Sequence, residues 1–335
     1  MKKQNKILLA VIIIFLILII LVFGLPLFSN SDQHDISVTT NPLLWEIEGD
    51  KPSYLYGSIH LAKEEVLTLP DVVMDKLNEV DAVYTEIKLD EETQMYVLQM
   101  SILSDGQTLD DLLPSDVLNR LHMFLNSKGY PSSTFSNYKI WMVNSYLALL
   151  DNLDDYMIRP ELDAYIWNLA VSKGKNTGGI ETADEQINIF DDLSIEEQIQ
   201  LLNDTLDSLE SYQQIGINPI DVMLDAYLQG DLKLIQDLML TDYDENDSFD
   251  LKMKNSLIIN RNYNMSERIS QLINDNPDEQ FFFTIGAGHF YGDEGIINLL
   301  EKEGFNVERV LFRECNNCDS GEISIDGRCY YPYEK

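Results

Sequence analysis

The sequence predicts an α+β fold in which a mixed β-sheet is built from the N- and C-terminal segments of one domain, with a large helical insertion between them. One transmembrane helix precedes this domain. Short apolar runs typical of strands lie within residues 43–87 and 280–312. Between about 91 and 275, apolar residues recur at the spacing of three and four that is typical of amphipathic helices.

The first strands are predicted around a turn. Leu43–Ile47 and Tyr54–Tyr56 alternate apolar and polar residues on either side of Gly49–Pro52, which predicts a β-hairpin. A helical pattern over 71–80 and a strand over 81–87 follow. Strand, helix and strand within so few residues resemble a βαβ unit.

The middle of the domain is predicted to be mostly helical, with one short strand. The predicted helices cover 115–127, 137–150, 160–173, 194–210 and 248–275. The interruption at 176–181 has the pattern of a strand and leads into a helix from Ala183. A buried strand at 280–285, a helix at 293–303 and a strand at 307–312 return the chain to the sheet.

The N-terminus has the pattern of a membrane anchor. Three lysines precede an uncharged segment from Ile7 to Phe28, and acidic residues follow it. About 20 apolar residues span a bilayer as a helix. Because the positive charges come first, the domain is expected to face outward from the cell membrane. Small residues at 29–31 leave a cleaved signal peptide, and thus secretion, as the alternative, but the apolar run is long for one.

The remaining boundaries follow from composition. Residues 1–6 form the cytoplasmic end, 7–28 the anchor, 29–42 a linker, 43–312 the main domain and 313–335 a cysteine-containing tail. Cys315, Cys318 and Cys329 all lie in that tail. Outside the cytoplasm two of them can form a disulfide, and the sequence leaves their pairing open.

The charge balance excludes one class of partner. Acidic residues number 57 against 23 basic ones, which gives a formal net charge of -34. A surface of this sign repels the phosphate backbone, so the chain is not expected to bind nucleic acid.

Four polar residues follow predicted strands and are candidates for one shared site. They are His60, Glu86, Glu181 and His289. Glycines precede both histidines and allow the backbone to approach closely there. Two imidazoles and two carboxylates make a workable ligand set for a divalent metal. Each residue taken alone is more often structural, so the case depends on their meeting at the end of the sheet.

The order of these motifs resembles a known family. Tyr56–His60, Glu86, Gly179–Gln186, Arg261–Asn262 and Gly286–His289 together resemble the TraB/GumN family, which includes pheromone-shutdown proteins and the animal Tiki proteases. The resemblance covers residues 43–312, and it extends more weakly to the erythromycin esterase/ChaN-like superfamily.

The resemblance implies roles for five residues. His60, Glu86 and His289 would bind a divalent metal cation, manganese or cobalt, with zinc as a third candidate. Glu181 would be a further ligand or the general base, and Arg261 would stabilise negative charge on the substrate. The expected activity is a metal-dependent hydrolase, a peptidase with a peptide or protein substrate.

Two other functions stay open at this stage. As in the esterase relatives, His60 could activate water directly with Glu86 or Glu181, without a metal. As in the pheromone-shutdown relatives, the domain could instead sequester a peptide without cleaving it, and its acidic surface would suit a cationic one.

Overall fold

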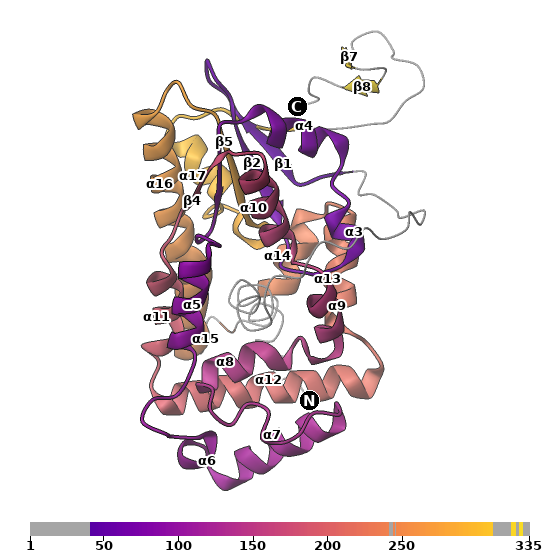
Figure 1. Cartoon of the computed structure of the whole chain (residues 1–335), viewed down its shortest axis with the longest axis vertical. Helices are drawn as coiled ribbons and strands as arrows, with labels where there is room; N and C mark the ends of the chain where they lie inside the picture. The colour runs from indigo at the N-terminus through magenta and orange to yellow at the C-terminus, as the bar shows by residue number, and fades with distance from the viewer. Residues whose placement is uncertain (1–40, 241–243, 245, 311–322, 326–327, 331–335) are drawn as a thin grey trace.

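The structure is a computed structural model that describes residues 41–240, 244, 246–310, 323–325 and 328–330. Its centre is a six-stranded mixed sheet in the order β4-β3-β5-β2-β1-β6 (Figure 1). The strands are β1 Leu44–Ile47, β2 Ser53–Ser58, β3 Ala82–Thr85, β4 Asn176–Gly179, β5 Phe281–Gly286 and β6 Val307–Arg309. The prediction of an α+β fold with a sheet drawn from both ends of the domain is confirmed.

The C-terminal strand β5 lies in the middle of the N-terminal strands. The predicted hairpin is present, with β1 antiparallel to β2. The predicted βαβ unit is present as β2, α4 (Asp71–Glu79) and β3, but β5 is inserted between its two strands and runs parallel to both. Since β4 is also parallel to β3, the carboxyl ends of four strands meet at one edge of the sheet.

Helices fill most of the insertion. Those described are α3 Glu64–Leu67, α4, α5 Glu91–Met100, α6 Leu109–Leu112, α7 Ser115–Ser127, α8 Ile140–Leu147, α9 Leu153–Ile158, α10 Leu162–Ser172, α11 Ala183–Asp191, α12 Ile195–Ile215, α13 Pro219–Leu228, α14 Leu232–Leu240, α15 Ser248–Lys254, α16 Asn260–Asp275 and α17 Ile296–Lys302. The predicted helix over 248–275 is α15 and α16 joined by a π-helical turn at Asn255–Ile259. Helices α6, α7, α8 and α12 lie at the end of the molecule away from the β1–β2 turn (Figure 1).

The two central strands are buried throughout. Every residue of β2 and β5 is inaccessible to solvent, and Phe281, Phe282 and Phe283 are at most 1% exposed. The ring of Phe282 packs against Tyr56, with centroids 5.8 Å apart. An apolar run without alternation is what a parallel strand covered on both faces requires.

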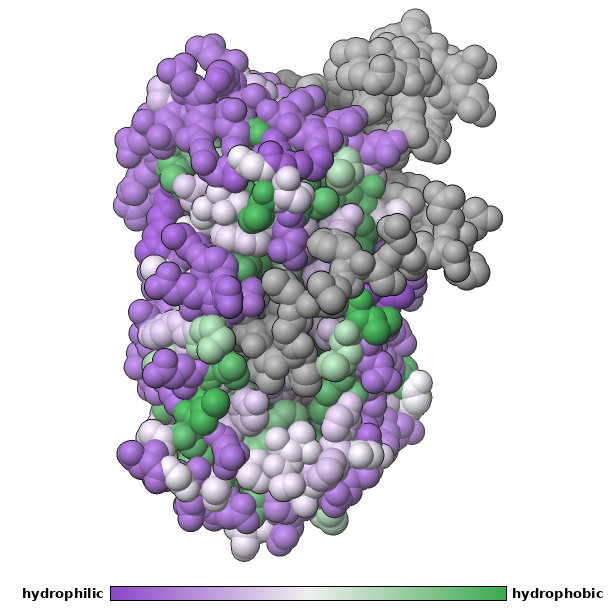
Figure 2. Space-filling model, in the orientation of Figure 1, coloured by the Kyte–Doolittle hydropathy of each residue, from purple (hydrophilic) through white to green (hydrophobic). Residues whose placement is uncertain are grey.

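The predicted anchor cannot be assessed from the described residues. Within these ranges, no helix is both long and apolar enough to cross a bilayer. Residues 7–28 lie outside them, as do Cys315 and Cys318, so the anchor and the cysteine pairing stay predictions. Cys329 falls in β8 (Arg328–Tyr330), which pairs with β7 (Ile323–Ile325). Hydrophilic residues cover much of the visible surface around the sheet (Figure 2).

Replacing Phe282 by Ala removes a fully buried ring from the central strand and leaves a cavity. We expect the free energy of unfolding to fall by about 3–5 kcal/mol, measured by urea denaturation of the full chain. Tyr263→Ala, at a side chain that is 50% exposed, should change it by less than about 0.5 kcal/mol. Equal losses for the two variants would contradict this account of the core.

Candidate metal centre

The five residues singled out from the sequence all lie at the carboxyl edge of the parallel strands. His60 comes two residues after β2, Glu86 directly follows β3, and Glu181 comes two residues after β4. His289 ends a short 3-10 turn after β5, and Arg261 reaches the same place from α16. None of these side chains is more than 6% exposed. Residues more than 200 positions apart in the chain therefore share one buried site.

Gly286 is the point around which three of them gather. A Cβ atom on this glycine would lie 3.1 Å from Glu86 Oε1, 3.6 Å from His60 Nε2 and 3.8 Å from His289 Cδ2. The amide N–H of Gly286 also donates to Glu86 Oε1 at 2.7 Å. Gly286 is thus favoured at this position, because the side chain of any other residue would press on Glu86.

Arg261 holds the two glutamates in place. Its Nη2 donates to Glu86 Oε2 at 2.5 Å and to Glu181 Oε2 at 2.6 Å, and its Nε donates to both oxygens of Glu181. Gln186 Nε2 donates to the same two carboxylates. Burial would raise the pKa of Glu86, but the charge of Arg261 and the hydrogen bond from the Gly286 amide help to hold it below its usual value. Glu86 is therefore held as a carboxylate.

These contacts set a condition on the predicted role of Glu181. Each of its carboxylate oxygens already accepts a hydrogen bond from Arg261. For Glu181 to take a proton from water, the guanidinium has to move away from it. The role of general base stays a prediction.

His289 is held in one tautomer by Asn262. The Nδ2 of Asn262 donates to the carbonyl of Glu294 at 2.7 Å, so its Oδ1 is the atom that faces His289 Nδ1 at 2.6 Å. Nδ1 must then carry the proton, which leaves the lone pair on Nε2, 4.0 Å from Glu86 Oε1. Burial and the charge of Arg261 lower the pKa of His289 to about 3. His289 is therefore a neutral imidazole whose lone pair faces Glu86.

The other nitrogen of His60 faces two acids that the sequence did not single out. Nδ1 lies 2.7 Å from Asp163 Oδ2 and 3.6 Å from Glu161 Oε2, while Ser58 Oγ donates to Asp163 Oδ1. Both acids stand at the start of α10, where Glu161 is the N-cap residue but makes no capping hydrogen bond. One signal was present: Asp163 is the only charged residue of a mostly apolar helix, Leu162–Ser172, which indicates that its side chain is buried beside a partner.

The residues fit a divalent cation. Both oxygens of Glu161 and Oδ2 of Asp163 are buried without a hydrogen-bond partner, and one ligand atom from each acid and from His60 lie within 4.8 Å of one another. Four buried carboxylates, including Glu86 and Glu181, face one guanidinium and two imidazoles, of which His289 is neutral. Burial raises the pKa of Glu161 well above its usual range, so its charged form is costly unless a cation lies beside it.

Comparison with known proteins now identifies the family. The model of the TraB/PrgY/gumN family matches residues 43–309, most of the chain. The chain belongs to this family. Several curated members are similar along nearly its whole length, and the resemblance predicted from the motifs is confirmed.

Three relatives illustrate the likeness. Metalloprotease TIKI1 of Danio rerio is 28% identical over 89% of this chain and 68% of its own length. The Metalloprotease TIKI homolog of Amphimedon queenslandica is 27% identical over 89% and 67%. The uncharacterized protein YbaP of Shigella flexneri is 22% identical over 76% and 89%. No solved structure matches the chain.

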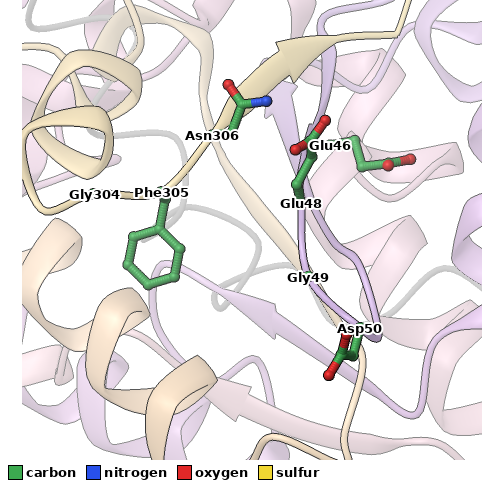
Figure 3. A pocket seen from close by; sticks show the side chains of 7 residues that line it. All are labelled: Glu46, Glu48, Gly49, Asp50, Gly304, Phe305 and Asn306. Carbon is green, nitrogen blue, oxygen red and sulfur yellow. The ribbon is translucent and has the colours of Figure 1, made fainter.

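A hollow at the opposite edge of the sheet is a weaker candidate for a metal or catalytic site. Glu46, Glu48 and Asp50 of the β1–β2 hairpin line this hollow together with Phe305 and Asn306 (Figure 3). Its lining offers carboxylates but neither a histidine nor a cysteine. The strand edge with His60 and His289 therefore remains the place for chemistry.

In the metal-free chain, the pKa of His60 should lie above that of an ordinary histidine, and the pKa of His289 should lie below it. Burial lowers the pKa of His60, but Asp163 and Glu161 raise it to about 9. His60 should thus be charged and His289 neutral at about pH 7. Imidazole ¹⁵N shifts, assigned with His60→Gln and His289→Gln, would measure this.

The stability of the metal-free chain should follow the same shift. The interactions that raise the pKa of His60 stabilise the fold fully at pH values below 6.5, the ordinary value for the unfolded chain. This contribution is lost as the pH rises through about 9.

For His289, an ordinary titration near pH 6.5 would contradict the tautomer and the environment described above.

Proposed function

We propose that this chain is a metal-dependent hydrolase that cleaves peptide bonds in a peptide or protein substrate. The observation that carries the proposal is the set of buried carboxyl oxygens beside His60, from Glu161 and Asp163, that have no hydrogen-bond partner and that a divalent cation would engage. The printed names of the most similar relatives, metalloproteases of the TIKI group, support the same activity.

Each described group has a part in this proposal. A bound divalent cation would supply a Lewis acid and lower the pKa of water. His60 is the residue on which such a cation would be held. On its Nε2 side lie Glu86 and His289, the partners predicted from the sequence, and on its Nδ1 side lie Glu161 and Asp163, which the structure adds. The neutral His289 offers a lone pair to accept a proton.

Arg261 keeps one donor for the substrate. Its Nε and Nη2 are taken by Glu181 and Glu86, whereas Nη1 makes only a 3.4 Å contact with the carbonyl of Leu257. A guanidinium that is fixed on one side by two carboxylates can present its other side to a developing oxyanion. This geometry supports the charge-stabilising role predicted for Arg261.

We also propose that the domain works outside the cell, held to the membrane by residues 7–28. The support for this is the uncharged apolar segment with its preceding lysines. Manganese, cobalt and zinc remain the candidate metals, since imidazole and carboxylate ligands suit all three.

Removal of metal tests the proposed function. Exhaustive chelation of the full chain should abolish cleavage of a peptide library, and Mn²⁺ or Co²⁺ should restore it, with products read by mass spectrometry. His60→Ala and His289→Ala should each lower the rate by more than about 100-fold. His122→Ala, at the half-buried histidine of α7, is the matched control and should retain full activity.

Two outcomes would replace the proposal. Cleavage that survives complete metal removal would favour direct activation of water by His60. Stoichiometric capture of a peptide without any product would favour a sequestering protein.

Gly286→Ala tests the geometry without changing a polar group. Its new methyl group would lie 3.1 Å from Glu86 Oε1, so we expect the peptidase rate to fall by roughly 100-fold with the fold intact. Gly49→Ala, whose nearest neighbour would be the Lys51 carbonyl at 3.4 Å, should leave the rate unchanged. Full activity of Gly286→Ala would mean that Glu86 and its neighbours do not act together.

A further inference from the structure

His60 faces acids on both sides, but a neutral imidazole has only one lone pair. Its Nε2 lies on the side of Gly286 and Glu86, and its Nδ1 on the side of Glu161 and Asp163. A cation bound at one nitrogen leaves a proton on the other. Only one side of His60 can therefore hold a cation. The hydrogen bonds of the acids on each side show which of them have no partner.

The side of Glu86 is already satisfied. Oε1 accepts from the amide of Gly286, and Oε2 accepts from Arg261 and Gln186. The guanidinium shares its one positive charge between this carboxylate and Glu181. Glu86 gains little from a cation that would have to displace these donors.

The side of Glu161 lacks hydrogen-bond donors, and its two acids have only the imidazole of His60 beside them. Glu161 is 0% exposed, and neither of its oxygens accepts a hydrogen bond. Although Asp163 Oδ2 lies 2.7 Å from His60 Nδ1, the contact does not have hydrogen-bond geometry, and both atoms are without a partner. Ser58 fixes Asp163 through its other oxygen, so Oδ2 remains directed to this side.

We propose that the catalytic divalent cation binds on the Nδ1 side of His60, with His60, Glu161 and Asp163 as its protein ligands. This assignment rests on the proposed function. The proton on Nε2 would then lie on the side of Glu86, whose negative charge favours a proton there. Glu86 and His289 would act around the cation instead of binding it.

Ordered water is the alternative occupant of this space. Water could satisfy the oxygens of Glu161 but would not balance their charge. In that case Asp163 and Glu161 would only orient His60, and cation binding would not depend on them.

Cation binding by substituted full-length chains separates these assignments. After chelation, each chain is titrated with Mn²⁺ by calorimetry, and with Co²⁺ by its visible absorption. Glu161→Gln and Asp163→Asn should raise the dissociation constant by more than about 100-fold, since loss of a ligand costs at least as much as loss of an outer partner. His289→Gln should stay within about 10-fold of the unsubstituted chain.

Matched controls come from another helix start. Asp116 occupies the same second position of α7 that Asp163 occupies in α10, and it is exposed. Asp116→Asn should bind Mn²⁺ as the unsubstituted chain does. In the metal-free state, Glu161→Gln should melt no lower than the unsubstituted chain, because the neutral amide avoids the cost of burying a carboxyl group whose oxygens accept no hydrogen bond.

The outcomes distinguish this assignment from the proposed function. A large loss for His289→Gln with none for Glu161→Gln and Asp163→Asn would overturn the assignment, as would losses of equal size in all three. If cleavage still required metal in either case, the proposed function would stand. If Glu161→Gln and Asp163→Asn alone lost Mn²⁺ but the loaded chain cleaved no peptide, the site would stand and the proposed function would fall.

Discussion

The buried surplus of negative charge at the carboxyl edge of the sheet is the constraint on which this structure depends. Four carboxylates lie there with one guanidinium, and no side chain among them is more than 6% exposed. Charges buried in this way are tolerated only where partners compensate them. Arg261 donates hydrogen bonds to Glu86 and Glu181, but Glu161 and Asp163 have only His60 beside them, without such hydrogen bonds. A fold that keeps this arrangement gives up stability for a site that attracts a cation.

The sheet topology creates the site. Because β5 enters between β2 and β3, the loop after β5 lies directly beside those after β2 and β3. Gly286 at the end of β5 then touches the side chains that follow both neighbours. The helical insertion contributes the remaining groups, with α10 supplying the two acids and α16 supplying Arg261. A single strand from the C-terminus thus closes a site that the N-terminal strands begin.

Patterns in the sequence predicted the site residues that follow strands. They did not predict the contacts that depend on how distant elements pack together. His60, Glu86, Glu181 and His289 could be grouped because each follows an apolar run, and parallel strands bring such positions together. Arg261 was predicted as a site residue only from the family resemblance. The insertion of β5 was not predicted, because strand order depends on contacts far apart in the chain. Glu161 was missed since an acid before a helix is ordinarily a cap.

The two sides of His60 explain why Arg261 stands where it does. One neutral imidazole cannot serve cations on both sides, so the carboxylates on the second side need another positive group. A guanidinium suits that place because it stays charged and its planar donors match two carboxylates at once. Asn262, the next residue on the same helix, fixes His289 with its lone pair toward Glu86. One turn of α16 therefore sets both the charge and the proton position on this side, which leaves the Nδ1 side free for a cation.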